Sequence, residues 1–292
     1  MATQTFRAFT PEIWSPRINY FLKAKMGAAK FFDNYSDEVT EGGDDIWIPS
    51  VAATQHTVSD VTTTTGDVTG GNISDTKSKL TIDTWKASAY AFPDFQAAQI
   101  AKKYPLRKAY AMAMGYQLGK TFESAILSNA TSITPTVGST ATQLLATNIE
   151  KAFSIAESRS IPMDESVLFL NPKTYWKDIM AISKYYDASS FGKGAPTAQG
   201  YHDLLYGVPV YLSTFLPAAA GAGVYNLLIQ KSAIVYAFGN LPQVQNSSAT
   251  PSGVRLSEKH GESLRVKYIA DIMYGIAVLN ATRGVQLISA SK

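Results

Sequence analysis

The chain is 292 residues long, 46% hydrophobic and 17% charged, with a net charge of +3, as expected of a globular protein that can bury a sizeable core. It contains no cysteine, which excludes disulfide bonds, thiolate catalysis and cysteine-ligated metals. The sequence shows neither a signal peptide nor an apolar run of about 18 residues, so we expect a protein that is made in the cytosol and does not enter a membrane.

The first 32 residues are basic and contain an apolar segment. Five basic residues stand against one acidic residue, Glu12, which gives a net charge of +4 and leaves the rest of the chain close to neutral. The basic side chains are Arg7, Arg17, Lys23, Lys25 and Lys30, and the large apolar ones include Ile13, Trp14, Ile18, Tyr20 and Phe21. Such a segment can contact a polyanion or form a solvated helix face, and its apolar residues favour docking on another surface.

A predicted strand over residues 44–50 leads into a long polar stretch, residues 49–84. Ile46 and Ile48 alternate around Trp47, which is typical of a strand. The stretch is rich in Thr, Ser, Gly and Asp, and between residues 50 and 79 its only aliphatic side chains larger than Ala are Val51, Val58, Val61, Val68 and Ile73. Ordering one residue costs about 1–2 kcal/mol of backbone entropy, so these few side chains cannot form a core of their own. The stretch is therefore either disordered or ordered by something outside it.

The central part of the sequence predicts a long helix followed by an α/β layer. No proline interrupts residues 106–129, and two stripes at helical spacing run through them. One stripe contains Tyr110, Gln117 and Thr121, and the other contains Met114, Leu118, Phe122 and Ile126. A capping box of Thr147 and Glu150 predicts a second helix that ends by residue 162. A buried strand over 166–170, a helix after the N-cap Asn171, and strands over 208–213 and 224–230 follow.

The carboxy-terminal part predicts a meander of three strands, over residues 264–270, 273–280 and 285–288. The turns are expected at Asp271 and at Arg283-Gly284.

The sequence lacks the residue arrangements that enzyme sites need. His56, His202 and His260 are not spaced as a metal-binding pair, and the adjacent Asp44 and Asp45 would point to opposite faces of a strand. No phosphate-binding glycine loop or nucleophile elbow occurs. We therefore expect no catalytic residue, no metal and no cofactor.

The order of these parts resembles a known family of shell proteins. The segments that carry the resemblance are FTPEIWS at 9–15, GGDDIWIP at 42–49, LFLNP at 168–172, YGVPVY at 206–211 and YGIAVL at 274–279, with the polar stretch and the long helix between them. Together they resemble the major capsid proteins of tailed bacteriophages with the Hong Kong 97 type (HK97-like) fold. The resemblance covers essentially the whole chain.

The resemblance implies an α+β fold with named parts. Residues 1–35 correspond to an amino-terminal arm, and residues 49–84 to an extended β-hairpin loop that reaches across a neighbouring subunit. Residues 36–48 and 85–144 correspond to a peripheral domain with a spine helix over 105–128. Residues 145–250 correspond to an axial α/β domain, and residues 251–292 to strands that return to the peripheral domain.

The function implied is a major capsid protein that self-assembles through hexamers and pentamers into an icosahedral shell around double-stranded DNA. The contact candidates between subunits are then Ile13, Trp14, Ile18, Tyr20, Phe21, Val58, Val61, Val68, Ile73 and Lys77. Arg7, Arg17, Lys23 and Lys25 are the candidates for the DNA-facing surface. Expected partners are a separate scaffolding protein, because the arm begins close to Met1, a portal and decoration proteins. The expected location is the virion capsid, after assembly in the host cytoplasm.

Two other functions stay open at this point. An encapsulin-like compartment would have the same fold and a protein cargo. A soluble enzyme with a disordered insertion at residues 50–84 would stay folded and active after cleavage there, whereas a shell protein would lose assembly.

Overall fold

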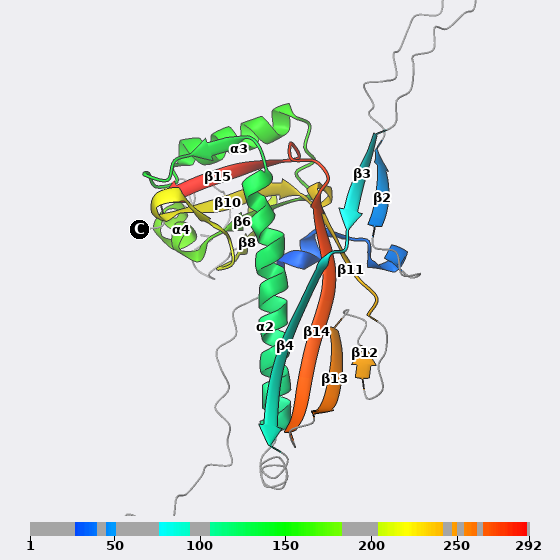
Figure 1. The fold of residues 1–292 in the computed structure, drawn as a ribbon. Helices are drawn as coiled ribbons and strands as arrows, with labels where there is room; N and C mark the ends of the chain where they lie inside the picture. Colours follow the sequence, from blue (N-terminus) through cyan, green and yellow to red (C-terminus); the bar gives the residue numbers. More distant parts are fainter. Residues whose placement is uncertain are drawn as a thin grey trace, which may run out of the picture.

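The computed structural model describes residues 27–39, 45–50, 76–93, 106–182, 204–241, 247–249, 254–261 and 265–290. They form two large sheets, a separate hairpin and three helices (Figure 1). The helices are α2 (Leu106–Ser128), α3 (Ala146–Ser158) and α4 (Pro172–Lys177). Short 3-10 turns lie at Ala28–Phe31, Ser36–Val39, Asn129–Ser132, Ile179–Ala181, Ala220–Ala222 and Lys231–Ala233. This mixture confirms the expected α+β class.

The first sheet, here called the long sheet, is built around β14 (Arg265–Val278). One edge of β14 pairs with β4 (Thr84–Pro93), and the other edge pairs with β13 (Val254–Gly261) and β11 (Ile234–Phe238), all antiparallel. The short strands β12 (Ser247–Ala249) and β1 (Asp33–Asn34) extend the sheet beyond β13 and β11.

The second sheet, here called the mixed sheet, is centred on β10 (Gly223–Gln230). Antiparallel neighbours of β10 are β15 (Gly284–Ala290), β6 (Ser166–Leu170) and β9 (Ala218–Ala219). Parallel pairs join β15 to β5 (Thr136–Gly138) and β6 to β8 (Val208–Leu212), and β7 (Leu204–Leu205) completes the sheet. The third sheet is the hairpin of β2 (Asp45–Ser50) and β3 (Thr76–Thr81).

The predicted turn at Asp271 is wrong. Asp271 lies within β14, a single strand of 14 residues that runs from Arg265 to Val278 without interruption. The carboxylate of Asp271 is bound by side chains from both neighbouring strands, so a charged residue is accommodated inside the sheet. A turn does form next to the predicted position Arg283-Gly284: the Arg283 N–H donates to the Asn280 carbonyl over 3.3 Å, and Gly284 begins β15.

The long helix is confirmed, and α2 lies along the long sheet (Figure 1). Only one of its two predicted stripes is buried, the one with Met114, Leu118, Phe122 and Ile126. On the other stripe Gln117 and Thr121 are exposed. Polar side chains on that stripe make exposure to water the more favourable arrangement.

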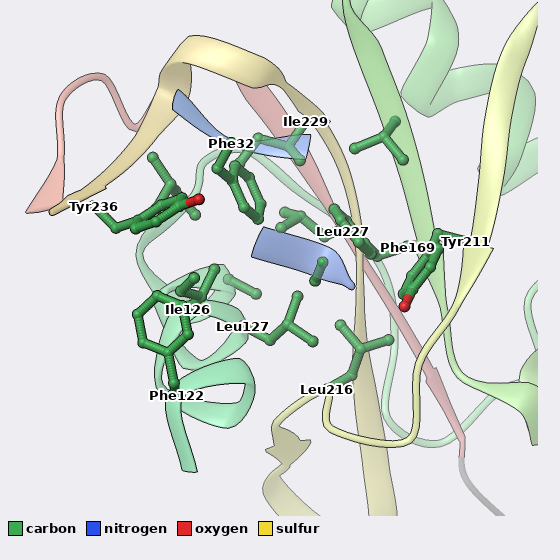
Figure 2. Packing of buried hydrophobic residues seen from close by; sticks show 14 of the residues in the cluster. Phe32, Phe122, Ile126, Leu127, Phe169, Tyr211, Leu216, Leu227, Ile229 and Tyr236 are labelled. Carbon is green, nitrogen blue, oxygen red and sulfur yellow. The ribbon is translucent and has the colours of Figure 1, made fainter. Parts of the chain in front are cut away.

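One hydrophobic core joins α2 to both sheets. Figure 2 shows Phe122 and Ile126 of α2 among Phe169 of the mixed sheet, Tyr236 of the long sheet and Phe32 of the amino-terminal segment. The ring centroids of Phe122 and Tyr236 are 5.4 Å apart, and those of Phe32 and Phe169 are 5.7 Å apart. Each large side chain buried here contributes about 1.5–3 kcal/mol of transfer free energy, so the sheets are fixed to each other through shared packing.

A second core holds α3 and α4 on the mixed sheet, with Ile149, Phe153, Leu168 and Leu287 among its residues. The helix predicted there is confirmed but its capping box is not, since the N-cap is Leu145 and no side chain caps it. The cap of α4 is confirmed: Asn171 accepts a hydrogen bond from the Lys173 N–H.

Strand pairing groups three strands differently from the predicted division of the chain. β11 lies in the long sheet although its residues fall in the range expected for the axial domain. β5 and β15 lie in the mixed sheet although their residues fall in ranges expected for the peripheral domain. Each of these three strands pairs with a strand that is distant in the sequence, and a division of the chain into consecutive ranges does not anticipate such pairing. Sheet membership does not by itself set a domain boundary, so the proposed boundaries stay predictions.

Candidate assembly surfaces

Of the predicted contact residues, the structure describes Lys77. The others lie outside the described residues: Ile13, Trp14, Ile18, Tyr20, Phe21, Val58, Val61, Val68 and Ile73, together with the DNA-facing candidates Arg7, Arg17, Lys23 and Lys25. Their roles stay predictions.

The β2–β3 hairpin projects from the body of the subunit (Figure 1). The register pairs Asp45 with Thr81 at the base and Ser50 with Thr76 at the outer end. Ile46 and Leu80 face inward and pack with Val235 of the long sheet in a small third core. The base of the hairpin is thus anchored by burial, and its outer end extends away from the subunit.

The outward face of the hairpin carries an aromatic side chain between cations. Trp47 is 52% exposed, and the ammonium groups of Lys77 and Lys79 lie 4.3 and 5.7 Å from its ring centroid. Lys79 also forms a 2.8 Å ion pair with Asp45, and its hydrogen bond lowers the pKa of the Asp45 carboxyl. Cation–π contacts hold the indole in one orientation. An exposed, oriented tryptophan is typical of a protein–protein contact.

A glycine of β14 lets the end of the hairpin cross the long sheet closely. A Cβ atom at Gly275 would lie 2.1 Å from the Thr81 carbonyl oxygen and 3.0 Å from the Ile82 Cα. These atoms belong to the backbone and cannot move aside easily. The position therefore requires glycine, and it sets how the hairpin leaves the body.

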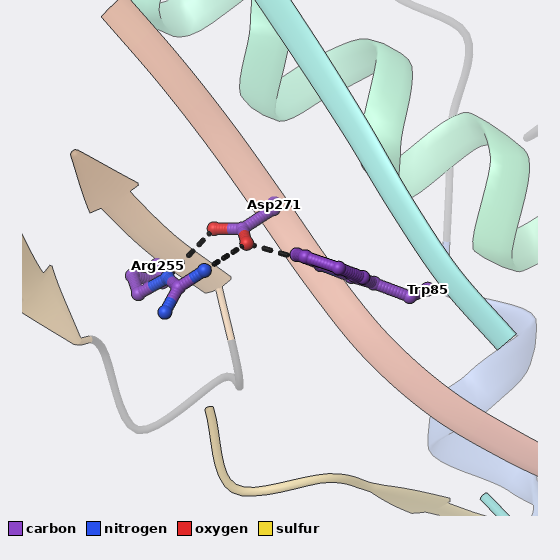
Figure 3. Close-up of polar contacts among 3 residues, drawn as sticks. All are labelled: Trp85, Arg255 and Asp271. Atoms are coloured by element: carbon purple, nitrogen blue, oxygen red, sulfur yellow. Dashed lines mark hydrogen bonds and ion pairs between the residues drawn. The ribbon is translucent and has the colours of Figure 1, made fainter. Parts of the chain in front are cut away.

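A second exposed tryptophan lies at the start of β4. Trp85 is 63% exposed, yet its indole N–H donates to Asp271 Oδ2 over 3.0 Å (Figure 3). Asp271 is buried, and Arg255 of β13 binds both of its carboxylate oxygens, with Nε 3.0 Å from Oδ1. This hydrogen bonding raises the pKa of Arg255. The ion pair thus positions the Trp85 ring on the sheet surface.

Sequence reasoning missed the Trp85, Arg255 and Asp271 cluster. The first two residues lie 186 and 16 positions from Asp271, and each belongs to a different strand. The alternation that predicts a strand gives no register between strands, so no local signal could have joined the three.

The point where the amino-terminal segment enters the subunit is buried. Glu123 of α2 accepts hydrogen bonds from the backbone N–H groups of Gly27 and Ala28, over 3.0 and 2.8 Å, and its side chain lies in the core. Further along the same segment, Asp33 pairs with Lys231 of the 3-10 turn before β11 over 3.1 Å. The last part of the predicted arm, from residue 27 onward, is therefore built into the subunit.

Within the described ranges, no group of three His, Cys, Asp or Glu side chains is arranged to hold a metal ion. None of the helices in those ranges is long and apolar enough to cross a membrane. His56, His202 and Asp44 lie outside the described residues.

No family model and no curated protein matches the sequence, but solved structures do. A structure from Mycobacterium phage Che8 matches with a TM-score of 0.76 at 20% identity, over 97% of this chain and 98% of that one. The capsid of Cyanophage P-SCSP1u matches with a TM-score of 0.75 at 14% identity, over 100% and 96% of the two chains. The head structure of Helicobacter pylori bacteriophage KHP40 matches with a TM-score of 0.73 at 11% identity, over the full length of both chains.

These matches span nearly the whole of both chains and therefore include the hairpin, α2 and the two sheets together. The chain accordingly has the fold of phage capsid proteins, the HK97-like fold that the sequence resemblance implied.

Proposed function

We propose that this chain is a major capsid protein, a structural and non-enzymatic protein that self-assembles into the icosahedral head shell of a bacteriophage. The observation that carries the proposal is the end-to-end likeness to phage capsid structures. The hairpin with its exposed Trp47 supports it further, because a feature that extends from the body gains stability from contact with another copy.

In the proposed mechanism, residues 49–84 of one subunit lie over the peripheral part of an adjacent subunit. Backbone groups in that loop then find hydrogen-bond partners across the interface, and the cost of ordering the loop is offset by contacts that a lone subunit lacks. The apolar residues of the arm, such as Trp14 and Phe21, add a second contact. Hexamers and pentamers repeat these modest contacts many times, which makes the closed shell stable through multivalency.

The remaining expectations belong to the same proposal. A scaffolding protein, a portal and decoration proteins are the partners, and double-stranded DNA is enclosed through sequence-independent contacts with Arg7, Arg17, Lys23 and Lys25. The protein is assembled in the host cytoplasm and located in the virion capsid.

Electron microscopy of the purified full-length protein tests the proposal. We expect closed icosahedral particles of uniform size, formed by the protein alone or with its scaffolding protein. Deleting residues 54–75 should abolish closed shells while circular dichroism shows a folded subunit. A monodisperse monomer under all conditions would overturn the proposal. Normal particles from the deletion variant would overturn the role of the loop, and particles filled with a protein cargo would favour a compartment instead.

A further inference from the structure

β4 forms an outer edge of the long sheet, and within the described part of the chain this edge is open (Figure 1). One side of β4 pairs with β14 along the whole length of the strand. No described strand pairs with its other side. Four alternate residues of β4 are all exposed: Trp85, Ala87, Ala89 and Ala91. Another strand could therefore reach this side of β4.

The hydrogen bonds of β14 show which backbone groups of β4 point outward. The Gly239 N–H donates to the Met273 carbonyl over 2.9 Å, so the backbone groups of Met273 point toward the edge on which β11 lies. Met273 is paired with Trp85, and this pair therefore exchanges no hydrogen bond. Because the direction alternates along an antiparallel ladder, the backbone groups that point away from β14 are those of Trp85, Ala87, Ala89 and Ala91. Pro93 belongs to the same series, and its missing N–H costs no ladder bond there.

The open edge of β4 lacks the features that keep most sheet edges from pairing. Natural edge strands are short, charged or interrupted by a bulge. β4 has ten residues, an unbroken register and one charged side chain, Lys86. The strands that end the two large sheets elsewhere, β1, β5, β7 and β12, have only two or three residues. A long and nearly uncharged edge is a template for a strand from another chain.

We propose that the open edge of β4 pairs with the same edge of a second copy, antiparallel, about a two-fold axis. The two long sheets then form one continuous sheet across two subunits. The inference rests on the proposed function, because it requires copies to assemble, and it identifies two edges that meet. A two-fold contact needs a surface that is complementary to itself. β4 meets this condition, because the registers of longest overlap place Lys86 opposite residue 90 or residue 92 of the other copy, so the like charges stay apart.

The position of α2 suits this arrangement, because the helix packs on both β4 and β14. The rings of Tyr110 and Tyr90 join α2 to β4 with centroids 5.3 Å apart, and those of Phe122 and Tyr274 join it to β14 with centroids 5.0 Å apart. Neighbouring strands lie about 4.8 Å apart, so a helix above β4 and β14 lies about 10 Å from its copy across the axis, an ordinary helix packing distance. Tyr110 is 44% exposed and lies with Tyr90 near the axis, so the second helix covers it.

Hydrogen exchange resolved to single amides tests the pairing. In the unassembled subunit we expect the amides of Ala87 and Ala89 to exchange rapidly, because they point to water, and those of Ser88 and Tyr90 to exchange slowly, because they bond to β14. In closed particles the exchange of Ala87 and Ala89 should slow by about tenfold or more. Equal exchange of these two amides in particles and subunits would overturn the inference. Slowing that requires bound scaffolding protein would also overturn it, because the edge would then belong to that protein.

A proline at an outward position tests the same hydrogen bonds by mutation. Ala89→Pro removes an outward N–H and leaves the ladder to β14 intact, as at Pro93. We expect a folded subunit by circular dichroism and a yield of closed particles that falls about tenfold. Ala89→Val is the matched control, because valine adds similar bulk, keeps the N–H and suits a strand, and it should assemble normally. Normal particles from Ala89→Pro would refute the pairing, and so would an equal loss from Ala89→Val, which would place the contact on the side chains.

Cysteine substitution shows whether the partner strand is a second β4, since the chain has no cysteine of its own. The variant Ala87→Cys/Ala89→Cys places cysteines opposite each other in both registers of longest overlap. Oxidation during assembly should give a disulfide-linked dimer on a non-reducing gel. Lys259→Cys, at an exposed position of β13, should give none. Absence of the dimer, or equal cross-linking of the control, would refute the pairing and leave the shell function standing, whereas a wild-type protein that forms no particles would refute the proposed function itself.

Discussion

Replacing Arg255 by Met would show how much the ion pair in the long sheet stabilises the subunit. The side chains of Arg255 and Asp271 are 12% and 2% exposed. The substitution removes both of the arginine's hydrogen bonds to the carboxylate and leaves, among the described residues, the one from Trp85. Breaking a buried pair by removing one partner costs about 3–5 kcal/mol, since the remaining charge stays buried without compensation. We therefore expect the free energy of unfolding to fall by that amount.

Urea unfolding of the unassembled subunit, followed by circular dichroism, measures this change. Lys231→Met is the matched control, because Lys231 also pairs with an aspartate, Asp33, but is 55% exposed. It should cost less than about 1 kcal/mol. The double variant Arg255→Met/Asp271→Leu buries no charge and should regain most of the lost stability. A loss below about 1 kcal/mol for Arg255→Met, or a double variant no more stable than the single one, would refute the reasoning.

Three further predictions concern single positions, all measured on the unassembled subunit by urea unfolding. Gly275→Ala places a methyl group against the Thr81 backbone and should cost about 1–3 kcal/mol, whereas Gly115→Ala, with no atom within 4 Å of the new Cβ, should gain about 0.5–1 kcal/mol; equal effects would contradict the close crossing. Burial raises the pKa of the Asp178 carboxyl, so its ionisation opposes folding above the unfolded pKa. Asp178→Asn should therefore stabilise the subunit at pH 7 and lose this advantage near pH 3. A gain in stability that does not vary with pH would show that the ionisation of Asp178 is not its cause. Burial, together with the charge of Glu123, raises the pKa of Tyr211 to about 12. As the pH rises, the Tyr211 hydroxyl ionises in the unfolded chain before it ionises in the folded one, so the free energy of unfolding falls between pH 10 and 12 by about 3 kcal/mol. Tyr211→Phe should lack that part of the alkaline loss, and an unchanged pH profile would exclude Tyr211 as its source.

The elements with strong local patterns were predictable from the sequence. The proline-free run with an apolar stripe through Leu118 and Phe122 predicts α2, and the N-cap Asn171 marks the start of α4. The prediction failed at Asp271, where the alternation typical of a strand meets a residue typical of a turn. Asp271 looks like a turn residue because an aspartate in a strand is unfavourable on its own. Its two partners lie on other strands, and only the register brings them to it.

The candidate surfaces were predictable only in part. The shortage of apolar residues between Val51 and Ile73 indicates a segment that needs an outside partner. It does not indicate which surface accepts it. Which residues share a face of the long sheet depends on the register between strands such as β13 and β14, and no local pattern gives that register. Glu123 is a second example. Its buried carboxylate accepts hydrogen bonds from the backbone of Gly27 and Ala28, about 95 residues earlier in the chain, so the helix pattern around Glu123 does not reveal these partners.

The length of β14 has a mechanical consequence for the proposed shell when it is under load. β4 pairs with β14 from Arg265 to Tyr274, and β13 pairs with the other edge from Arg265 to Ile272. Ladder hydrogen bonds in antiparallel sheets run perpendicular to the strands. A pull by a neighbour along the strand direction therefore loads these bonds together, in shear. They would break one after another only if the strands were peeled apart sideways. The long sheet is thus oriented to resist tension along its own axis, which is the direction in which its far end extends from the core.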